Sequence, residues 1–129
     1  MALSAYPAFL SDEDVPTWIE RHLPQVELTS AGESLPRSMR RLVRLGAFLA
    51  DPDRIALFGS WARGDAIESS DYDLALFGIR RPDGFARLVH DAENEFVTLF
   101  AADLVDAERC GPALSEAIWR EGVTLYERP

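Results

Sequence analysis

The sequence predicts an α+β fold in which a small mixed or antiparallel sheet of about three to four strands packs against helices. Residues 55 to 58, Ile-Ala-Leu-Phe, form a short apolar run that is typical of a buried strand. A second apolar run, LALF, begins at Leu74, and residues 36 to 50 repeat apolar side chains at helical spacing. With 129 residues the chain can form one core, but not an additional recognition domain.

The charge balance argues against long nucleic acid as the main partner. The chain has 13 basic and 22 acidic residues and a net charge of −9, whereas binding to a phosphate backbone needs clustered positive charge. Every basic residue is arginine, because the sequence contains no lysine. This excludes a Walker-type P-loop and Schiff-base lysine chemistry.

Cysteine content and the N-terminal residues favour a cytoplasmic protein. The lone Cys110 cannot form an intrachain disulfide and has no cysteine or histidine at metal-ligand spacing. Residues 1 to 16 lack the basic region and the long apolar segment of a signal peptide or membrane anchor. We therefore expect a reduced, cytoplasmic setting with no membrane association.

Residues 1 to 35 are expected to form an N-terminal extension with a short helix that packs on the domain. Ser11 and the three acids after it are a typical helix start, because a hydroxyl caps the first turn and the helix dipole favours acids there. This helix should contain Trp18 and stop near Pro24. Residues 25 to 36 have loop chemistry around one candidate strand at residues 26 to 28.

Residues 36 to 129 are expected to form the main domain, beginning with a helix over residues 36 to 50. Its apolar face would consist of Leu35, Met39, Leu42, Gly46 and Leu49. Its opposite face carries a stripe of arginines, namely Arg37, Arg40, Arg41 and Arg44. The stripe is either a solvated helix surface or a contact surface for an acidic partner or the nucleotide.

Three further elements complete the expected domain. Residues 85 to 95 predict a helix with Phe85 and Leu88 facing inward, and residues 101 to 105 predict a third strand. Residues 113 to 121 predict a closing helix that buries Leu114 and Ile118. No helix or strand is predicted for the tail that begins at Gly122.

The chemically informative stretch is residues 59 to 73, GSWARGDAIESSDYD. Gly59 and Ser60 break the first strand in a tight turn that can open a helix. Asp71 and Asp73 lie two residues apart in the second strand, so their carboxylates project to the same side while Tyr72 points into the core. This combination can hold a divalent metal and phosphate together, although both acids could instead cap turns where the strand begins.

Residues 59 to 74 resemble the signature of the minimal nucleotidyltransferases (MNT) of the polymerase-beta-like superfamily, known chiefly as partners of HEPN toxins. The resemblance includes ARGD from Ala62 and SSDYDL from Ser69. Residues 102 to 106, ADLVD, resemble the third acidic strand of that family. Residues 118 to 126, IWREGVTLY, resemble its closing helix and tail, so the likeness covers residues 38 to 127.

The resemblance implies a polymerase-beta-like fold and a magnesium-dependent transfer of a nucleoside monophosphate. It implies that two Mg²⁺ ions are bound by Asp71, Asp73 and Asp103. It also implies that the triphosphate is held by Gly59, Ser60 and Arg63.

Asp106 is the other candidate for the third acid. Asp103 and Asp106 would point to opposite faces of a strand, so only one can join the site. The resemblance favours Asp103.

For the acceptor, the resemblance implies transfer of AMP from ATP to a tyrosine of a HEPN toxin, which makes the chain an antitoxin. One alternative is a non-catalytic antitoxin that neutralises its toxin by contact alone. Another is a small-molecule nucleotidyltransferase of the aminoglycoside-modifying kind. That type usually needs an additional helical domain, which a second subunit could replace, so a homo-oligomer is compatible with the sequence.

Overall fold

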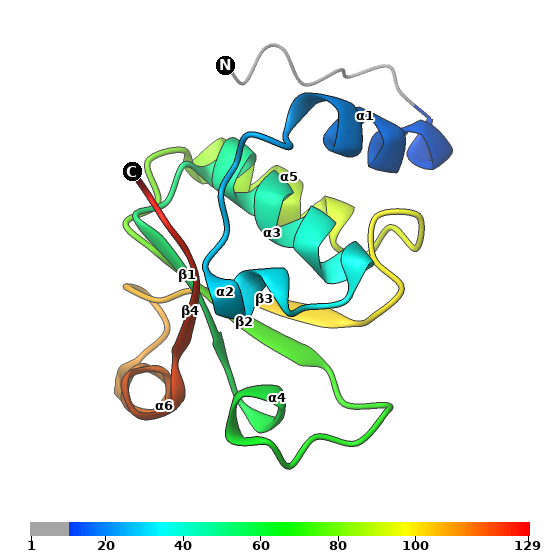
Figure 1. Ribbon diagram of the computed structural model, residues 1–129. Helices are drawn as coiled ribbons and strands as arrows, with labels where there is room; N and C mark the ends of the chain where they lie inside the picture. Colours follow the sequence, from blue (N-terminus) through cyan, green and yellow to red (C-terminus); the bar gives the residue numbers. More distant parts are fainter. Residues whose placement is uncertain (1–10) are drawn as a thin grey trace.

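A four-stranded mixed sheet forms the centre of the computed structural model, which describes residues 11–129 (Figure 1). The strand order is β3-β2-β1-β4, where β1 is Arg54–Phe58, β2 is Tyr72–Phe77, β3 is Ala102–Asp106 and β4 is Val123–Glu127. β1 is antiparallel to β2 and to β4, whereas β2 and β3 are parallel. The predicted α+β class and the small mixed sheet are confirmed.

Helices pack on both faces of this sheet. In chain order they are the 3-10 helix η2 (Asp12–Asp14), α1 (Val15–His22), α2 (Ser30–Glu33), α3 (Arg37–Ala50), α4 (Ser60–Arg63), α5 (Pro82–Asp91) and α6 (Pro112–Glu121). Figure 1 shows α3 and α5 side by side above the sheet, α1 beyond α3, and α6 on the other side.

Alternation along β2 separates the two sides of the sheet. Tyr72, Leu74 and Leu76 point into the main core, where they join the apolar face of α3. Ala75 points the other way and packs in a smaller cluster with Phe58 and Ile118 of α6. Asp73 shares the side of Ala75, so it lies on the face that α6 covers.

The predicted helix over residues 36 to 50 forms as α3, and its apolar positions are buried. Met39, Leu42 and Leu49 are each at most 1% exposed. A side chain at Gly46 would lie 3.2 Å from Leu88 of α5, so this glycine permits the close packing of α3 on α5. The amphipathic pattern was therefore sufficient to locate this helix.

Three sequence expectations were wrong in their details. Residues 26 to 28 form no strand; Val26 and Leu28 pack on the core, and only Thr29 bonds to the backbone of β4. The tail that received no element forms β4, which pairs with β1. The helix expected over residues 85 to 95 begins at Pro82 and ends at Asp91.

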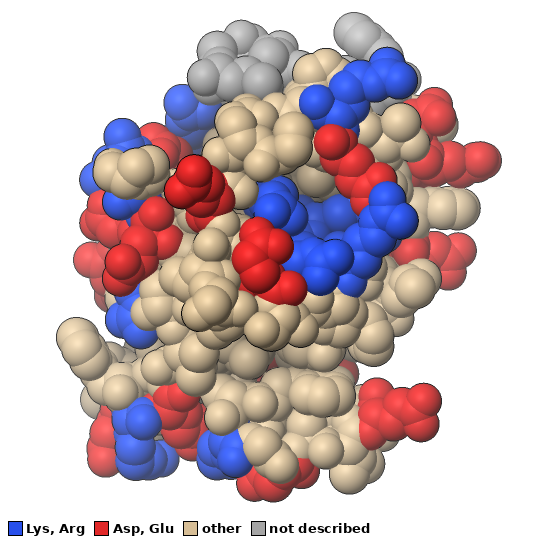
Figure 2. All heavy atoms as spheres, in the orientation of Figure 1, with Lys and Arg blue, Asp and Glu red and all other residues tan. Residues whose placement is uncertain are grey.

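The arginine stripe on α3 is bound to the chain around it. Arg37 and Arg41 pair with Glu20 of α1 at 2.8 and 3.2 Å, and Arg44 pairs with Glu33 at 2.9 Å. Three of the arginines also donate hydrogen bonds to backbone carbonyls of neighbouring segments. Arg40 donates to the carbonyls of Glu33 and Leu35, Arg41 to those of Phe96 and Val97, and Arg44 to that of Val26. Figure 2 shows this blue group with red side chains directly beside it. These ion pairs and hydrogen bonds thus hold three neighbouring segments against α3.

None of the helices in residues 11–129 combines the length and the apolar character that crossing a membrane would require.

Candidate functional site

A tight turn at Gly59 connects β1 to the short helix α4. Gly59 has φ +77°, a left-handed conformation that L side chains rarely adopt. A Cβ at this position would also overlap the carboxylate of Asp73. Glycine is therefore required here both for the backbone conformation and for the close approach of Asp73.

The strand register brings two of the predicted acids next to each other. Asp73 of β2 pairs with Phe58 at the end of β1 on one side and with Asp103 of β3 on the other. Side chains opposite one another in neighbouring strands share a face, so Asp73 and Asp103 both lie on the side covered by α6. Asp71 lies just before β2, two residues from Asp73. Asp71 and Asp103 are exposed, and Asp73 is half-buried.

Electrostatic repulsion accompanies this arrangement. Burial raises the pKa of Asp73 above its ordinary value, and the negative charges of Asp103 and Asp71 raise this pKa further, with Arg63 opposing them. Within residues 11–129, no hydrogen bond or salt bridge compensates the carboxylates of these three aspartates. The site is therefore a group of like charges whose mutual repulsion a bound cation would reduce.

The donor set suits magnesium, which prefers carboxylate oxygens. In the described part of the chain, however, no three Asp, Glu, His or Cys side chains are close enough together to hold one metal ion. The acids thus lie on one face of the sheet without forming a closed coordination cage.

Asp106, the other candidate for the third acid, is engaged in a turn. Its carboxylate accepts the N–H of Glu108 at 3.0 Å and lies 4.0 Å from the guanidinium of Arg109. It therefore stabilises the end of β3.

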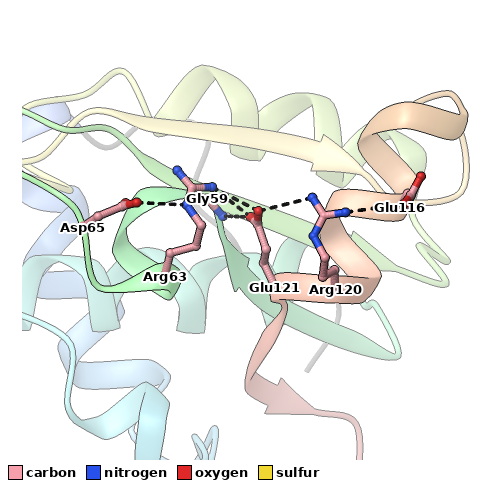
Figure 3. A network of polar contacts seen from close by, with 6 residues as sticks. All are labelled: Gly59, Arg63, Asp65, Glu116, Arg120 and Glu121. Carbon is pink, nitrogen blue, oxygen red and sulfur yellow. Dashed lines mark hydrogen bonds and ion pairs between the residues drawn. The ribbon is translucent and has the colours of Figure 1, made fainter.

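Arg63, at the end of α4, lies beside the Gly59 turn and pairs with a residue that the sequence did not suggest. Its Nη1 is 3.1 Å from both carboxylate oxygens of Glu121, and its Nε is 3.3 Å from Asp65 (Figure 3). Glu121 also accepts the backbone N–H of Gly59 at 2.9 Å. The pKa of Glu121 is lowered, first by this N–H and then by Arg63. Its only sequence signal was its place in the stretch that resembles the closing helix.

The spacer between the turn and the acids is held by aromatic packing. Trp61 stacks on Tyr72 with ring centroids 4.7 Å apart, and its Nε1–H donates to the carbonyl of Ser70 at 2.9 Å. Tyr72 is buried, as predicted. The half-exposed Ser60 begins α4, and no hydrogen bond of its hydroxyl is found within residues 11–129.

A cavity of about 460 Å³ adjoins the acids along β3. Asp73 and Asp103 contribute to its lining, together with apolar side chains that include Val89, Leu104 and Leu114. Asp73 and Asp103 thus border a space of the size that a small ligand occupies.

A family model described as "Polymerase beta, Nucleotidyltransferase" matches residues 48–129, a range that contains all four strands and the whole candidate site. The chain belongs to this nucleotidyltransferase family. This match and the fold confirm the predicted polymerase-beta-like nucleotidyltransferase domain.

The chain is also similar to a solved structure described as "Crystal structure of the toxin-antitoxin with AMP-PNP". The TM-score is 0.55 at 22% sequence identity, over 70% of this chain and 72% of that chain. At this identity the likeness shows a shared fold. A search of curated proteins gave no match.

Proposed function

We propose that the chain transfers a nucleoside monophosphate from a nucleoside triphosphate to an acceptor hydroxyl. The observation that carries the proposal is the register of β2 and β3, which puts Asp73 beside Asp103 next to the Gly59 turn. Burial raises the pKa of Asp73 and repulsion from Asp103 and Asp71 adds to this effect, which is expected where carboxylates are kept together for a cation.

In this proposal Asp71, Asp73 and Asp103 would hold two Mg²⁺ ions. When bound, such ions neutralise charge on the phosphates and orient the reacting oxygens. The N–H of Gly59, the hydroxyl of Ser60 and the guanidinium of Arg63 bind the triphosphate. Little else is required of the protein, because phosphoryl chemistry depends mainly on positioning and charge neutralisation.

The reaction is a displacement at the α-phosphorus. The acceptor oxygen forms a bond to this phosphorus, and the bond to the oxygen between the α- and β-phosphates breaks. Pyrophosphate leaves with the electron pair, and the acceptor proton passes to a carboxylate oxygen of Asp103. The cavity beside Asp103 is the space from which the acceptor approaches.

For the substrates we propose ATP as donor and a tyrosine hydroxyl of a HEPN-type toxin as acceptor, which makes the chain a cytoplasmic antitoxin. The solved structure with a related fold is described as a toxin-antitoxin with AMP-PNP, which supports an adenine nucleotide as donor and a toxin as partner. A net charge of −9 also suits a protein acceptor better than a polynucleotide.

A second candidate is an antitoxin that acts by contact alone. It is favoured by one observation, namely that no three acids of residues 11–129 are assembled tightly enough to hold a metal ion. In that case the carboxylates near Gly59 would be dispensable for neutralisation.

One experiment separates the two candidates. The protein is incubated with Mg²⁺, labelled ATP and a co-encoded HEPN toxin, and label on the toxin and remaining toxin activity are both measured. We expect the wild type to label and silence the toxin, and the Asp71→Ala, Asp73→Ala double variant to do neither. Equal silencing by both proteins without label transfer would overturn the enzyme proposal and establish the contact mechanism.

A further inference from the structure

Glu121 lies where the proposed triphosphate would have to bind. Its carboxylate accepts the N–H of Gly59 at 2.9 Å and both of its oxygens are 3.1 Å from Nη1 of Arg63 (Figure 3). These are two of the groups to which the proposed function assigns the phosphates. A carboxylate and a phosphate make the same kind of charge-assisted hydrogen bonds to a backbone N–H and a guanidinium.

The charge at this position is well defined. The side chain of Glu121 is only 11% exposed, whereas that of its partner Arg63 is 46% exposed. The lowered pKa of Glu121 keeps it anionic near neutral pH. Its negative charge also adds to the repulsion felt by Asp73. A bound triphosphate would bring several more negative charges to this place, so it cannot share the two donors with an anionic Glu121 without a large cost.

Glu121 has a second cation within reach outside the turn. Nη2 of Arg120 is 3.7 Å from Glu121 Oε1, and Arg120 is 64% exposed. Arg120 also pairs with Glu116, one turn earlier on α6. Glu121 is the last residue of α6, so in the displacement proposed below only its side chain would have to turn toward Arg120.

We propose that Glu121 is an internal placeholder for a phosphate group, which keeps Gly59 and Arg63 in their binding geometry and must be displaced when the nucleotide binds. The proposal rests on the nucleotidyltransferase function proposed above. Glu121 is a positioning residue in this account, because it acts through Gly59 and Arg63. Its charge sets the affinity for the polyphosphate part of the donor.

The test compares two variants that remove the same charge from the same helix. Glu121→Gln keeps an oxygen that can accept from Gly59 and Arg63, and Glu116→Gln is the matched control because the side chain of Glu116 is 77% exposed and makes no contact with the turn. Binding of AMP-PNP and of inorganic tripolyphosphate, each with Mg²⁺, is measured by calorimetry on the full chain.

We expect Glu121→Gln to bind both ligands about tenfold more tightly than the wild type, because a unit charge near the phosphates is removed. Glu116→Gln should bind like the wild type. Glu121→Asp keeps the charge but shortens the side chain, so its affinity for both ligands should be intermediate. This variant provides the test if Glu121→Gln does not fold. If the wild type binds measurably and the Glu121 variants bind equally or more weakly, the placeholder proposal is overturned. The proposed function would then remain intact. If neither the wild type nor any variant binds AMP-PNP, the proposed function fails and the placeholder fails with it.

Discussion

The four arginines of α3 and the aspartates around Asp73 are two charged regions that differ in how their charges are compensated. Three of the arginines pair with Glu20 or Glu33, and Arg40 donates to backbone carbonyls, as Arg41 and Arg44 also do. Among the described residues, the carboxylates of Asp71, Asp73 and Asp103 have no such compensation, and burial and repulsion raise the pKa of Asp73. A charge compensated within the chain contributes to the fold, whereas an uncompensated one is available to a ligand.

The strongest test of this contrast is Asp73→Asn, which should separate activity from stability. We expect nucleotidyl transfer to fall on the order of 10²-fold or more, because a carboxylate that would hold the proposed Mg²⁺ ions is lost. The melting temperature should rise instead, since burial and like charges disfavour the carboxylate in the folded state. Transfer assays and thermal unfolding at pH 7 measure the two effects; a fall in both would mean that Asp73 supports the fold.

The pH dependence of stability follows from the same group. The pKa of Asp73 is raised in the folded state, so the folded protein binds this proton more tightly than the unfolded chain. The Asp73 contribution therefore becomes less favourable as pH rises from the unfolded pKa, about 3.9, through the raised folded pKa. The melting temperatures of the wild type and Asp73→Asn should converge at low pH, and a constant difference from pH 3 to pH 7 would contradict this assignment.

Two aspartates of β3 provide the next comparison. Asp103→Asn should reduce transfer by at least about tenfold, in the range found for groups that orient a metal ligand set. Asp106→Asn makes the same chemical change three residues away, where the carboxylate only stabilises a turn, and should retain transfer. Equal activity of the two variants would remove Asp103 from the site.

The arginine region should show the opposite behaviour, with a smaller effect. Arg41→Ala removes hydrogen bonds to Glu20 and to the carbonyls of Phe96 and Val97, so we expect a loss of about 1–2 kcal/mol in the free energy of unfolding. Arg37→Ala is the control, because its side chain is 72% exposed and such pairs contribute about 0–1 kcal/mol. Chemical denaturation measures both values. Transfer activity should remain in both variants, and its loss in Arg41→Ala at unchanged stability would assign the stripe to a ligand.

The sequence was most informative where the structure depends on neighbours along the chain. The amphipathic pattern located α3, and the apolar runs located β1 and β2. The alternation of side chains along β2 correctly placed Tyr72 and Asp73 on different faces of the sheet. β4 was missed because its pairing with β1 joins segments far apart in sequence. Glu121 was missed for the same reason, since its partner Gly59 is 62 residues away. Likewise, only the register of the sheet brings Asp103 beside Asp73.

The most direct test of the central claim follows two phosphorus labels in the transfer reaction. ATP labelled at the α-phosphate and ATP labelled at the γ-phosphate are incubated in parallel with the protein, Mg²⁺ and the toxin. Nucleotidyl transfer at the carboxylates beside Gly59 predicts that the α-label remains on the acceptor and the γ-label is released as pyrophosphate. Retention of the γ-label, or α-label transfer that persists in Asp73→Asn, would contradict the account.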